Sequence, residues 1–284
     1  MRSFNSLMLT LSILCVFLYF RVSTTASSIR YKITLSYDGS GFHGWQTQSH
    51  DKTIQECLED ALSTLLRERI SVTGAGRTDS TVNAVGYVAH FDTSVEDLDA
   101  GLVGYKINAI LPHGIKVHDI VPTTPDFHSR FDARQREYKY FIHRKKDPFI
   151  SHYSYLYTFP IDVEKMNRAA VKLLGKHDFS CFEKVGGDNK TSICTVTKAV
   201  WETYVPDHVS MMGYPAEEDD YLVFTIRADR FLRNMVRAVV GSLLDIGRGR
   251  HEEEWMDTLV EGGSRSDAGE SVPGHALFLC KVEY

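Results

Sequence analysis

The chain has 284 residues, of which 43% are hydrophobic, and this is enough for one or two domains with a substantial core. The formal net charge is −5, so the overall composition gives no indication of a partner that carries phosphates. None of the five cysteines forms a C-x-x-C pair, which argues against a zinc site and a disulfide framework. Motifs of the H-E-x-x-H, P-loop, G-x-S-x-G and dinucleotide-binding types are absent from the sequence, so those classes of enzyme are not indicated.

The charges are unevenly distributed along the chain. Residues 128–152 carry seven basic and three acidic side chains, and residues 226–250 carry six and two, so each segment has a net charge of +4. Residues 251–270 carry seven acidic side chains and one arginine. Two basic segments on an acidic protein can still neutralise phosphates where they lie on the surface. Ordinary solvated faces of the protein would give the same count and are the alternative.

The N-terminal segment, residues 1–28, differs from the rest of the chain. Residues 6–20 are mostly apolar, follow Arg2 and precede small residues, which is typical of a signal peptide and short for a membrane span. Export, an organelle-targeting leader and a start site placed too far upstream are three open explanations. We expect this segment to lie outside the fold. Because the unpaired cysteines fit a reducing compartment, we predict a cytoplasmic protein, with organelle targeting as the alternative.

Periodic patterns predict regular structure from residue 29 onward. Residues 30–37 alternate between apolar and polar side chains, as in a half-buried strand. Thr53 and Glu56 have the spacing of a capping box and predict the start of an amphipathic helix that reaches Leu65. The other elements predicted in this half are a short strand at 70–73, a strand with Val85, Tyr87, Ala89 and Phe91 on one side, a helix over 95–109 and a strand over 115–121.

A similar order of elements follows in the second half. Residues 134–144 alternate as a strand, and Asp162 predicts the start of a helix that runs through Leu174 and ends at Gly175. Strands near 194–205 and 221–228, a helix over 231–247 and a strand over 275–283 complete the chain. These successive strand-helix-strand-strand blocks predict a mixed α/β protein of the α+β class, with related domains at 29–125 and 126–284 that meet along their sheets.

The loop G-A-G-R-T-D at residues 74–79 is the first candidate functional segment. Its glycines allow a sharp turn and a close approach to a ligand, and they would present Arg77 and Asp79 at the tip of a loop between two strands. A carboxylate in such a loop can attack an electrophilic carbon if nearby cations keep it ionised. A plain turn, in which the aspartate side chain bonds its own backbone, is the alternative.

Two further segments carry arginines. Arg130, Arg134 and Arg136 precede or alternate with tyrosines on the strand at 134–144, and such interleaving suits base stacking beside phosphate contacts. A solvent-facing arginine row opposite a core-facing tyrosine row is the alternative. Arg233 and Arg237 lie four residues apart and are predicted to share one face of the helix over 231–247. An arginine on an apolar face needs an anionic partner, unless it extends along the surface to water.

Taken in chain order, these segments resemble one family, the TruA-type tRNA pseudouridine synthases. The resemblance covers residues 30–284. The matching blocks are Y-D-G-S-G-F-H-G-W-Q at 37–46, G-A-G-R-T-D at 74–79, F-H-S-R-F-D-A-R-Q-R-E-Y-K-Y at 127–140, L-L-G-K-H-D-F-S-C-F at 173–182, F-L-R-N-M-V-R-A-V-V-G-S-L-L-D-I-G at 231–247 and the closing L-F-L-C-K-V-E-Y.

The resemblance implies an isomerase that converts uridine to pseudouridine in the anticodon arm of tRNA, without a metal or cofactor. It implies a pseudouridine-synthase fold, in which two α/β domains share a mainly antiparallel sheet flanked by helices, and a homodimer that holds tRNA. Asp79 would be the nucleophile, attacking C6 of the base or C1′ of the ribose. Arg77 would occupy the space of the flipped-out uridine. Tyr138 would stack on the uracil and assist proton removal from C5, and Arg237 would pair with Asp79.

The chain departs from the family pattern just after Asp79. The family usually reads G-R-T-D-x-G-V-H, whereas this chain continues with Ser80, Thr81, Val82 and Asn83. Thr81 places a branched side chain where the turn is expected to need a positive φ. Asn83 keeps hydrogen-bonding capacity but lacks the possible charge of a histidine. A catalytically weakened RNA-binding or tRNA-folding module on the same scaffold is therefore the alternative function.

Overall fold

A computed structural model describes residues 28–49, 51–186 and 190–284. The predicted leader, residues 1–28, lies outside the described residues except for Ser28, so its role and the predicted localisation stay predictions. Over the described ranges, no helix has the length and apolar character needed to cross a membrane.

The described strands form one ten-stranded sheet whose main path has the order β4-β1-β3-β10-β5-β9-β8-β7. The pairings are antiparallel except for β10 with β3 and β5 with β6, so the predicted mainly antiparallel sheet is confirmed. The strands are β1 (Ile29–Tyr37), β2 (Val72–Gly74), β3 (Asn83–Thr93), β4 (Ile115–Pro122), β5 (Gln135–His143), β6 (Tyr155–Leu156), β7 (Gly175–Asp178), β8 (Ile193–Thr203), β9 (Tyr221–Ala228) and β10 (Leu277–Glu283).

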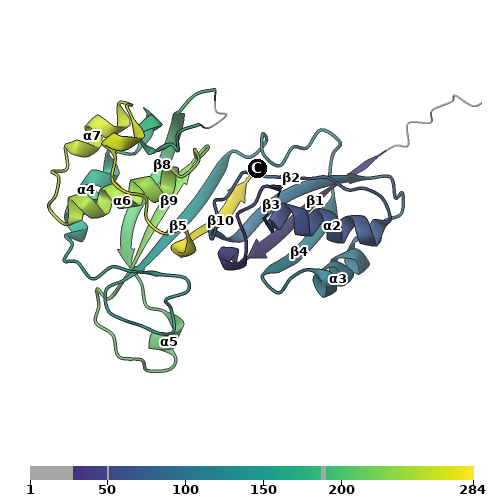
Figure 1. Cartoon of the computed structure of the whole chain (residues 1–284), viewed down its shortest axis with the longest axis horizontal. Helices are drawn as coiled ribbons and strands as arrows, with labels where there is room; N and C mark the ends of the chain where they lie inside the picture. The colour runs from purple at the N-terminus through teal and green to yellow at the C-terminus, as the bar shows by residue number, and fades with distance from the viewer. Residues whose placement is uncertain (1–27, 50, 187–189) are drawn as a thin grey trace, which may run out of the picture.

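The last strand, β10, lies in the middle of the sheet and joins its two halves. Leu279 pairs with Ala84 of β3 on one side and with Tyr138 of β5 on the other. The C-terminus therefore lies near the centre of the elongated molecule (Figure 1). The two halves share one continuous sheet, and a division of the chain into domains at residues 29–125 and 126–284 stays a prediction.

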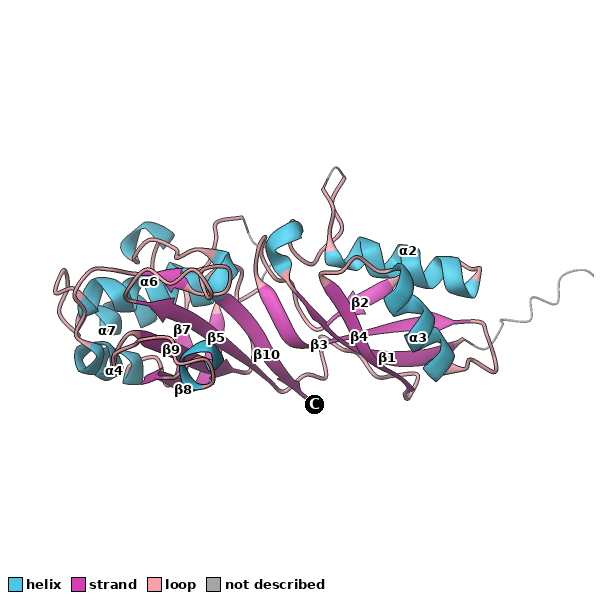
Figure 2. Cartoon of the chain, turned by 90° about the horizontal axis from the view of Figure 1, so that it is seen from below, coloured by secondary structure: helices cyan, strands magenta, loops and turns pink. Residues whose placement is uncertain are grey.

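The helices form two groups at opposite ends of the molecule, with β3, β10 and β5 between them (Figure 2). In the first group, the Thr53 side chain accepts the backbone N–H of Glu56 and starts α2, as the capping pattern predicts. In the second group, α4 packs against α6 and β8. The helices are α2 (Ile54–Leu66), α3 (Ala100–Ile110), α4 (Val163–Val171), α5 (Asp207–Ser210), α6 (Met235–Gly247) and α7 (Trp255–Val260).

Several predicted boundaries are wrong, and two of them have a local reason. The helix predicted over 231–247 begins at Met235, because Asn234 before it has left-handed backbone angles, φ 69° and ψ −5°. The helix predicted over 95–109 begins at Ala100, because the Asp99 side chain caps it by accepting the N–H of Leu102. The helix predicted through Leu174 ends at Val171.

One side chain of the predicted alternating row of β3 does not share the face of the others. Tyr87, Ala89 and Phe91 are buried, but Val85 is 56% exposed. It lies on the face of the sheet that the helices leave uncovered, beside Phe141, Phe278 and Cys280. The sequence does not predict the short elements β6, β7, α5 and α7, because a segment of so few residues is too short to show a periodic pattern of apolar side chains.

Candidate active site

The loop at 74–79 rests on a cluster of aromatic side chains from β1, β3 and residue 45. The Trp45 ring stacks on Tyr87 with centroids 4.1 Å apart. The Tyr87 hydroxyl donates a hydrogen bond to the Gly76 carbonyl, and the Tyr37 hydroxyl lies 2.9 Å from Thr78 Oγ1. A side chain at Gly74 would overlap the Tyr87 hydroxyl and the Trp45 ring. Glycine is therefore needed at residue 74 for close packing, which holds the loop in place.

The block at residues 37–46 supports the same loop from its other side. Trp45 N–H donates to the Thr78 carbonyl at 3.2 Å, and Thr81 N–H donates to the Phe42 carbonyl at 3.4 Å. Gly44 has φ 89°, and a Cβ on it would lie 2.5 Å from the Thr78 carbonyl oxygen. This turn therefore requires glycine both for its backbone angle and for its contact with the loop at 74–79.

Asp79 lies at the end of this loop between two arginines. Its side chain is 22% exposed, and its Oδ2 lies 3.3 Å from Nη1 of Arg237. Its Oδ1 lies 3.8 Å from Nε of Arg233. Arg237 is itself oriented by a 2.7 Å hydrogen bond from Nε to the Val272 carbonyl. Two cations at these distances stabilise a negative charge on the Asp79 carboxylate.

The two arginines reach Asp79 from different elements of the backbone. Arg237 lies in the first turn of α6, whereas Arg233 precedes the helix and the left-handed Asn234. The predicted shared helix face is therefore wrong, because residue 233 is outside the helix. The predicted proximity of Arg237 and Asp79 is present, and an anionic partner accounts for this arginine.

Tyr138 lies on β5 at the base of the site. Its side chain is buried, and its ring meets Phe231 edge to face at 4.9 Å. Burial raises the pKa of Tyr138; the charge of Arg136 opposes this and the charge of Asp79 adds to it. The phenol is therefore protonated at neutral pH.

Arg136 has a structural role that its place in the interleaved pattern did not predict. Its Nη1 donates to the carbonyls of Ala133 and Asp229 at 2.8 and 2.6 Å. Its Nη2 donates to the carbonyls of Arg130 and Ala75 at 2.7 and 3.1 Å. Burial lowers the pKa of this guanidinium. With these four contacts Arg136 joins the segment before β5, the loop at 74–79 and the residue that follows β9, so its donors are not available for phosphate binding.

Acidic side chains neutralise part of the basic segment at 128–152. Lys145 Nζ lies 2.8 Å from a Glu217 carboxylate oxygen and 3.1 Å from Asp220. Arg144 Nη1 lies 3.7 Å from Asp219. The acidic loop at 217–220 is thus the partner of these residues, and the count of charges overstates the basic surface.

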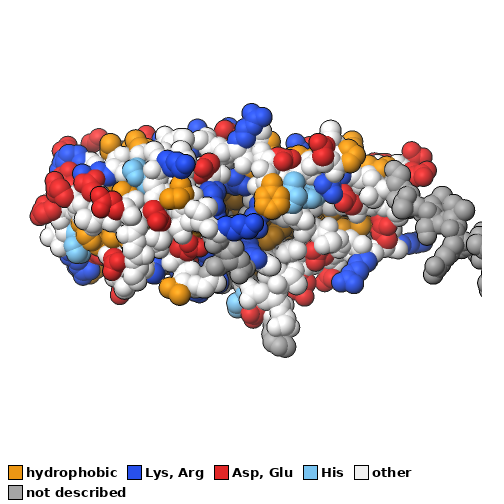
Figure 3. All heavy atoms as spheres, turned by 90° about the horizontal axis from the view of Figure 1, so that it is seen from above, with side chains coloured by type: hydrophobic (Ala, Val, Ile, Leu, Met, Phe, Trp, Pro, Cys, Tyr) orange, Lys and Arg blue, Asp and Glu red, His pale blue; other side chains and the backbone are white. Residues whose placement is uncertain are grey.

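A hollow lies near the middle of one face of the molecule, with Lys and Arg side chains at its edge (Figure 3). Arg77, two residues before Asp79, is exposed in the loop at 74–79. Arg130, Arg134 and Arg233 are also exposed. Of these, Arg77 is two residues from Asp79 in the sequence and Arg233 lies 3.8 Å from its carboxylate.

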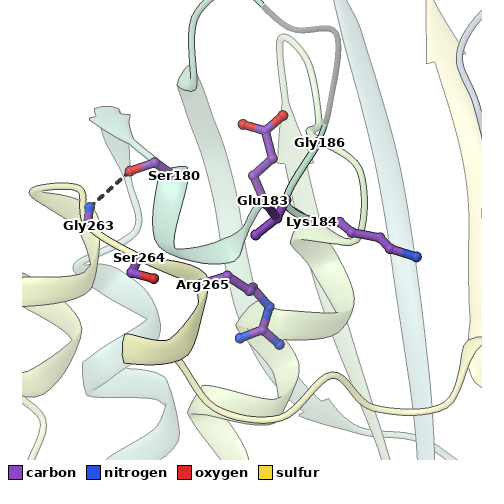
Figure 4. Close-up of a pocket in the computed structure, with 8 residues that line it drawn as sticks. Ser180, Glu183, Lys184, Gly186, Gly263, Ser264 and Arg265 are labelled. Atoms are coloured by element: carbon purple, nitrogen blue, oxygen red, sulfur yellow. Dashed lines mark hydrogen bonds between the residues drawn. The ribbon is translucent and has the colours of Figure 1, made fainter.

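A separate polar cavity of about 260 Å³ lies beside the segment that precedes α6. Gly263 N–H donates to Ser180 Oγ at 3.0 Å across it, while the side chains of Lys184 and Arg265 point away from this contact (Figure 4). Lys184 N–H donates to the Arg233 carbonyl at 3.0 Å, which connects the cavity wall to the active site. None of the predicted catalytic residues lines this cavity.

Comparisons with known proteins identify the family of this chain. Residues 33–132 and 169–284 match the tRNA pseudouridine synthase family. The chain belongs to that family. It is 47% identical over 256 residues to the tRNA pseudouridine synthase A of Bacteroides fragilis, a match that covers 90% of this chain and 96% of that protein. It is 48% identical over 255 residues to the enzyme of the same name from Bacteroides thetaiotaomicron, covering 90% of each, and 37% identical over 260 residues to that of Bacillus subtilis, covering 90% and 99%.

The residues that depart from the usual family pattern are integrated into the site. Thr81 has φ 66°, so the positive φ expected at this turn is confirmed. The Asn83 side chain accepts the Gly39 N–H at 2.8 Å and donates to the His275 carbonyl at 2.7 Å. Asn83 thus ties the block at 37–46 to the segment before β10. These contacts keep the turn after Asp79 in place and do not favour the alternative of a weakened RNA-binding module.

The sequence does not predict the contact of Arg233 with Asp79. It also does not predict that Trp45 and Asn83 hold the residues on either side of Asp79 in place. The spacing of Arg233 and Arg237 is a signal for the first. The others depend on pairings between distant parts of the chain, for which the sequence alone has no local signal.

Proposed function

We propose that this protein converts uridine to pseudouridine in the anticodon arm of tRNA, with Asp79 as the nucleophile. Membership of the tRNA pseudouridine synthase family supports the reaction and the class of substrate. The observation that carries the role of Asp79 is its position between Arg237 and Arg233 at the end of a tightly held loop. A carboxylate that lies beside two cations and is partly shielded from water is suited to nucleophilic attack.

The reaction is an isomerisation, so its atoms balance without a co-reactant. An Asp79 oxygen bonds to C6 of the uracil or to C1′ of the ribose, and the bond between N1 and C1′ breaks. The base turns and its C5 bonds to C1′, the bond to Asp79 breaks, C5 loses its proton and N1 gains one. Arg237 and Arg233 hold the carboxylate through these steps, and they stabilise its charge again when the product leaves.

Tyr138 and Arg77 position the base in this proposal. The buried Tyr138 ring forms the surface on which the uracil stacks. Because its phenol is protonated at neutral pH, stacking suits it better than accepting the C5 proton. Arg77, exposed at the loop tip, fills the space that the flipped uridine leaves in the RNA stack.

We also propose that the protein is a homodimer that uses the uncovered face of its sheet. An apolar hollow of about 320 Å³ on that face is lined by Val85, Phe141, Ile150, Tyr153, Tyr204, Phe278 and Cys280. Apolar side chains of this number on an open sheet face are typical of a protein interface. Sedimentation at micromolar concentration is expected to give twice the chain mass, and Val85→Asp is expected to reduce it to one chain mass. A wild-type protein that sediments as a monomer would remove this part of the proposal.

The function is tested with purified protein and unmodified tRNA transcripts that carry tritium at C5 of uridine. Formation of the new C5 bond releases the tritium, and chemical mapping of the product locates each pseudouridine. We expect stoichiometric release from transcripts with uridines in the anticodon arm, and modification confined to that arm. Release that maps to another arm would refute the substrate position, and no release from any transcript would refute the activity.

A further inference from the structure

An exposed aromatic ring, Phe131, lies on the loop between β4 and β5. It is 75% exposed. Its ring centroid lies 4.3 Å from that of His128, at an interplanar angle of 33°, and the Arg130 guanidinium lies 5.7 Å from the Phe131 ring centroid. An exposed phenylalanine with a second ring and a cation beside it has no evident role in the core.

The loop holds this ring in a defined position. The Asp132 side chain accepts the N–H of His128 at 2.7 Å, and the Asp132 N–H donates to the His128 carbonyl at 3.0 Å. The Phe131 N–H donates to Nδ1 of His128 at 3.3 Å. Because the backbone on both sides of the ring is hydrogen-bonded, a ligand that stacks on Phe131 orders few groups and loses little conformational entropy.

The loop between β4 and β5 is attached directly to the loop at 74–79 and to β2, which precedes it. The Ser129 hydroxyl donates to the Thr73 carbonyl at 2.7 Å. One nitrogen of Arg136 donates both to the Arg130 carbonyl and to the Ala75 carbonyl, four residues before Asp79. The ring is therefore fixed relative to the nucleophile. On the face with the central hollow, an exposed hydrophobic side chain and His side chains lie next to the basic side chains (Figure 3).

We propose that Phe131, with His128 and Arg130, is a stacking platform for an unpaired base of the tRNA outside the uridine that reacts at Asp79. Every base offers a flat face to an aromatic ring, and an adjacent arginine suits the phosphate that follows the base. The Arg130 guanidinium beside the Phe131 ring favours a nucleic acid over an apolar protein surface as its partner. The platform rests on the proposed function, and it differs from Tyr138, which is buried beneath the reacting base.

The test compares Phe131→Ala with Phe131→Trp in tRNA binding and in single-turnover kinetics. Because the stacking of one base on an aromatic ring contributes to the binding free energy, Phe131→Ala is expected to weaken tRNA binding by about tenfold. The rate at saturating tRNA should stay within about threefold of wild type, since the chemistry occurs at Asp79. Phe131→Trp keeps a flat ring and should restore the affinity. Tyr105→Ala is the matched control, because Tyr105 is 77% exposed and lies on α3, at one end of the molecule.

An affinity of Phe131→Ala equal to that of Tyr105→Ala would overturn the platform. A loss of affinity that Phe131→Trp does not restore would also overturn it, since the loss would then not come from stacking. Failure of the proposed function has a different signature: the wild-type protein would form no pseudouridine, whatever the binding of the Phe131 variants. Thermal unfolding of each variant confirms that it is folded.

Discussion

Replacement of Arg237 by methionine is the sharpest perturbation of the proposed site. The side chain keeps its apolar contacts with α6 but loses the guanidinium 3.3 Å from Asp79. Removal of one partner from a fully buried ion pair costs about 3–5 kcal/mol. Here the two side chains are 23% and 22% exposed and Arg233 remains 3.8 Å from the carboxylate, so we expect the smaller value of about 2–3 kcal/mol. That energy corresponds to a loss of roughly 30- to 150-fold in rate.

The assay is single-turnover release of tritium from C5 of uridine, with enzyme in excess over tRNA. Excess enzyme separates the chemical step from product release, so the rate reports on Asp79. Arg237→Lys keeps the charge and is expected to recover part of the rate. Arg250→Met is the matched control: it removes an arginine that pairs with Asp245 at 2.8 Å and is 55% exposed, and its effect on the rate should be under twofold.

Two results would refute this reasoning. A single-turnover rate of Arg237→Met within threefold of wild type would show that Asp79 does not depend on this cation. A loss confined to KM, with the saturated rate unchanged, would place Arg237 in tRNA binding and not in the support of the nucleophile.

Three further predictions concern the support of the site. Thr81→Gly should raise the free energy of unfolding by about 1 kcal/mol, because Thr81 has φ 66° and glycine adopts such angles without strain; an unchanged or lower thermal midpoint would contradict it. Asn83→Ala should lower that free energy by about 2–4 kcal/mol in urea unfolding, because it leaves the Gly39 N–H and the His275 carbonyl without their side-chain partner; a loss under 1 kcal/mol would show that water replaces the side chain. Burial lowers the pKa of His90 from 6.5 to about 4, so as the pH falls the unfolded chain gains this proton before the folded chain does. The stabilisation is therefore complete above about pH 6.5 and is lost towards pH 4, by about 2–3 kcal/mol, and His90→Asn should flatten unfolding curves measured across that window; equal slopes for variant and wild type would refute it.

Much of the secondary structure is predictable because its signals are local. The alternation in β1 and β5 and the cap at Thr53 depend only on neighbouring residues, and these elements occur as expected. The start of α6 is not predictable in this way. The apolar spacing continues towards the N-terminus beyond Asn234, but the left-handed backbone of Asn234 prevents the helix from including the residues before it. The insertion of β10 between β3 and β5 is a long-range pairing that no periodic pattern reveals.

In the candidate site, too, local sequence patterns are predictive and long-range contacts are not. The motif at 74–79 identifies Arg77 and Asp79, and the family resemblance adds Tyr138 and Arg237, but composition and spacing alone leave each of them open to a structural explanation. Only the folded chain shows that Arg136 binds four carbonyl groups. The reason is physical: an arginine in an alternating strand has the same sequence pattern whether its partner is a phosphate or the backbone of a distant loop.

The most direct test of the central claim is multiple turnover by Asp79→Asn, measured together with tRNA binding. The amide is nearly the same size as the carboxylate but cannot form the covalent bond, whereas affinity depends on phosphate contacts spread over many basic side chains. We predict no pseudouridine above background and a tRNA dissociation constant within about threefold of wild type. Continued multiple turnover by the purified variant, at any rate above that of a preparation without enzyme, would show that Asp79 is not the nucleophile.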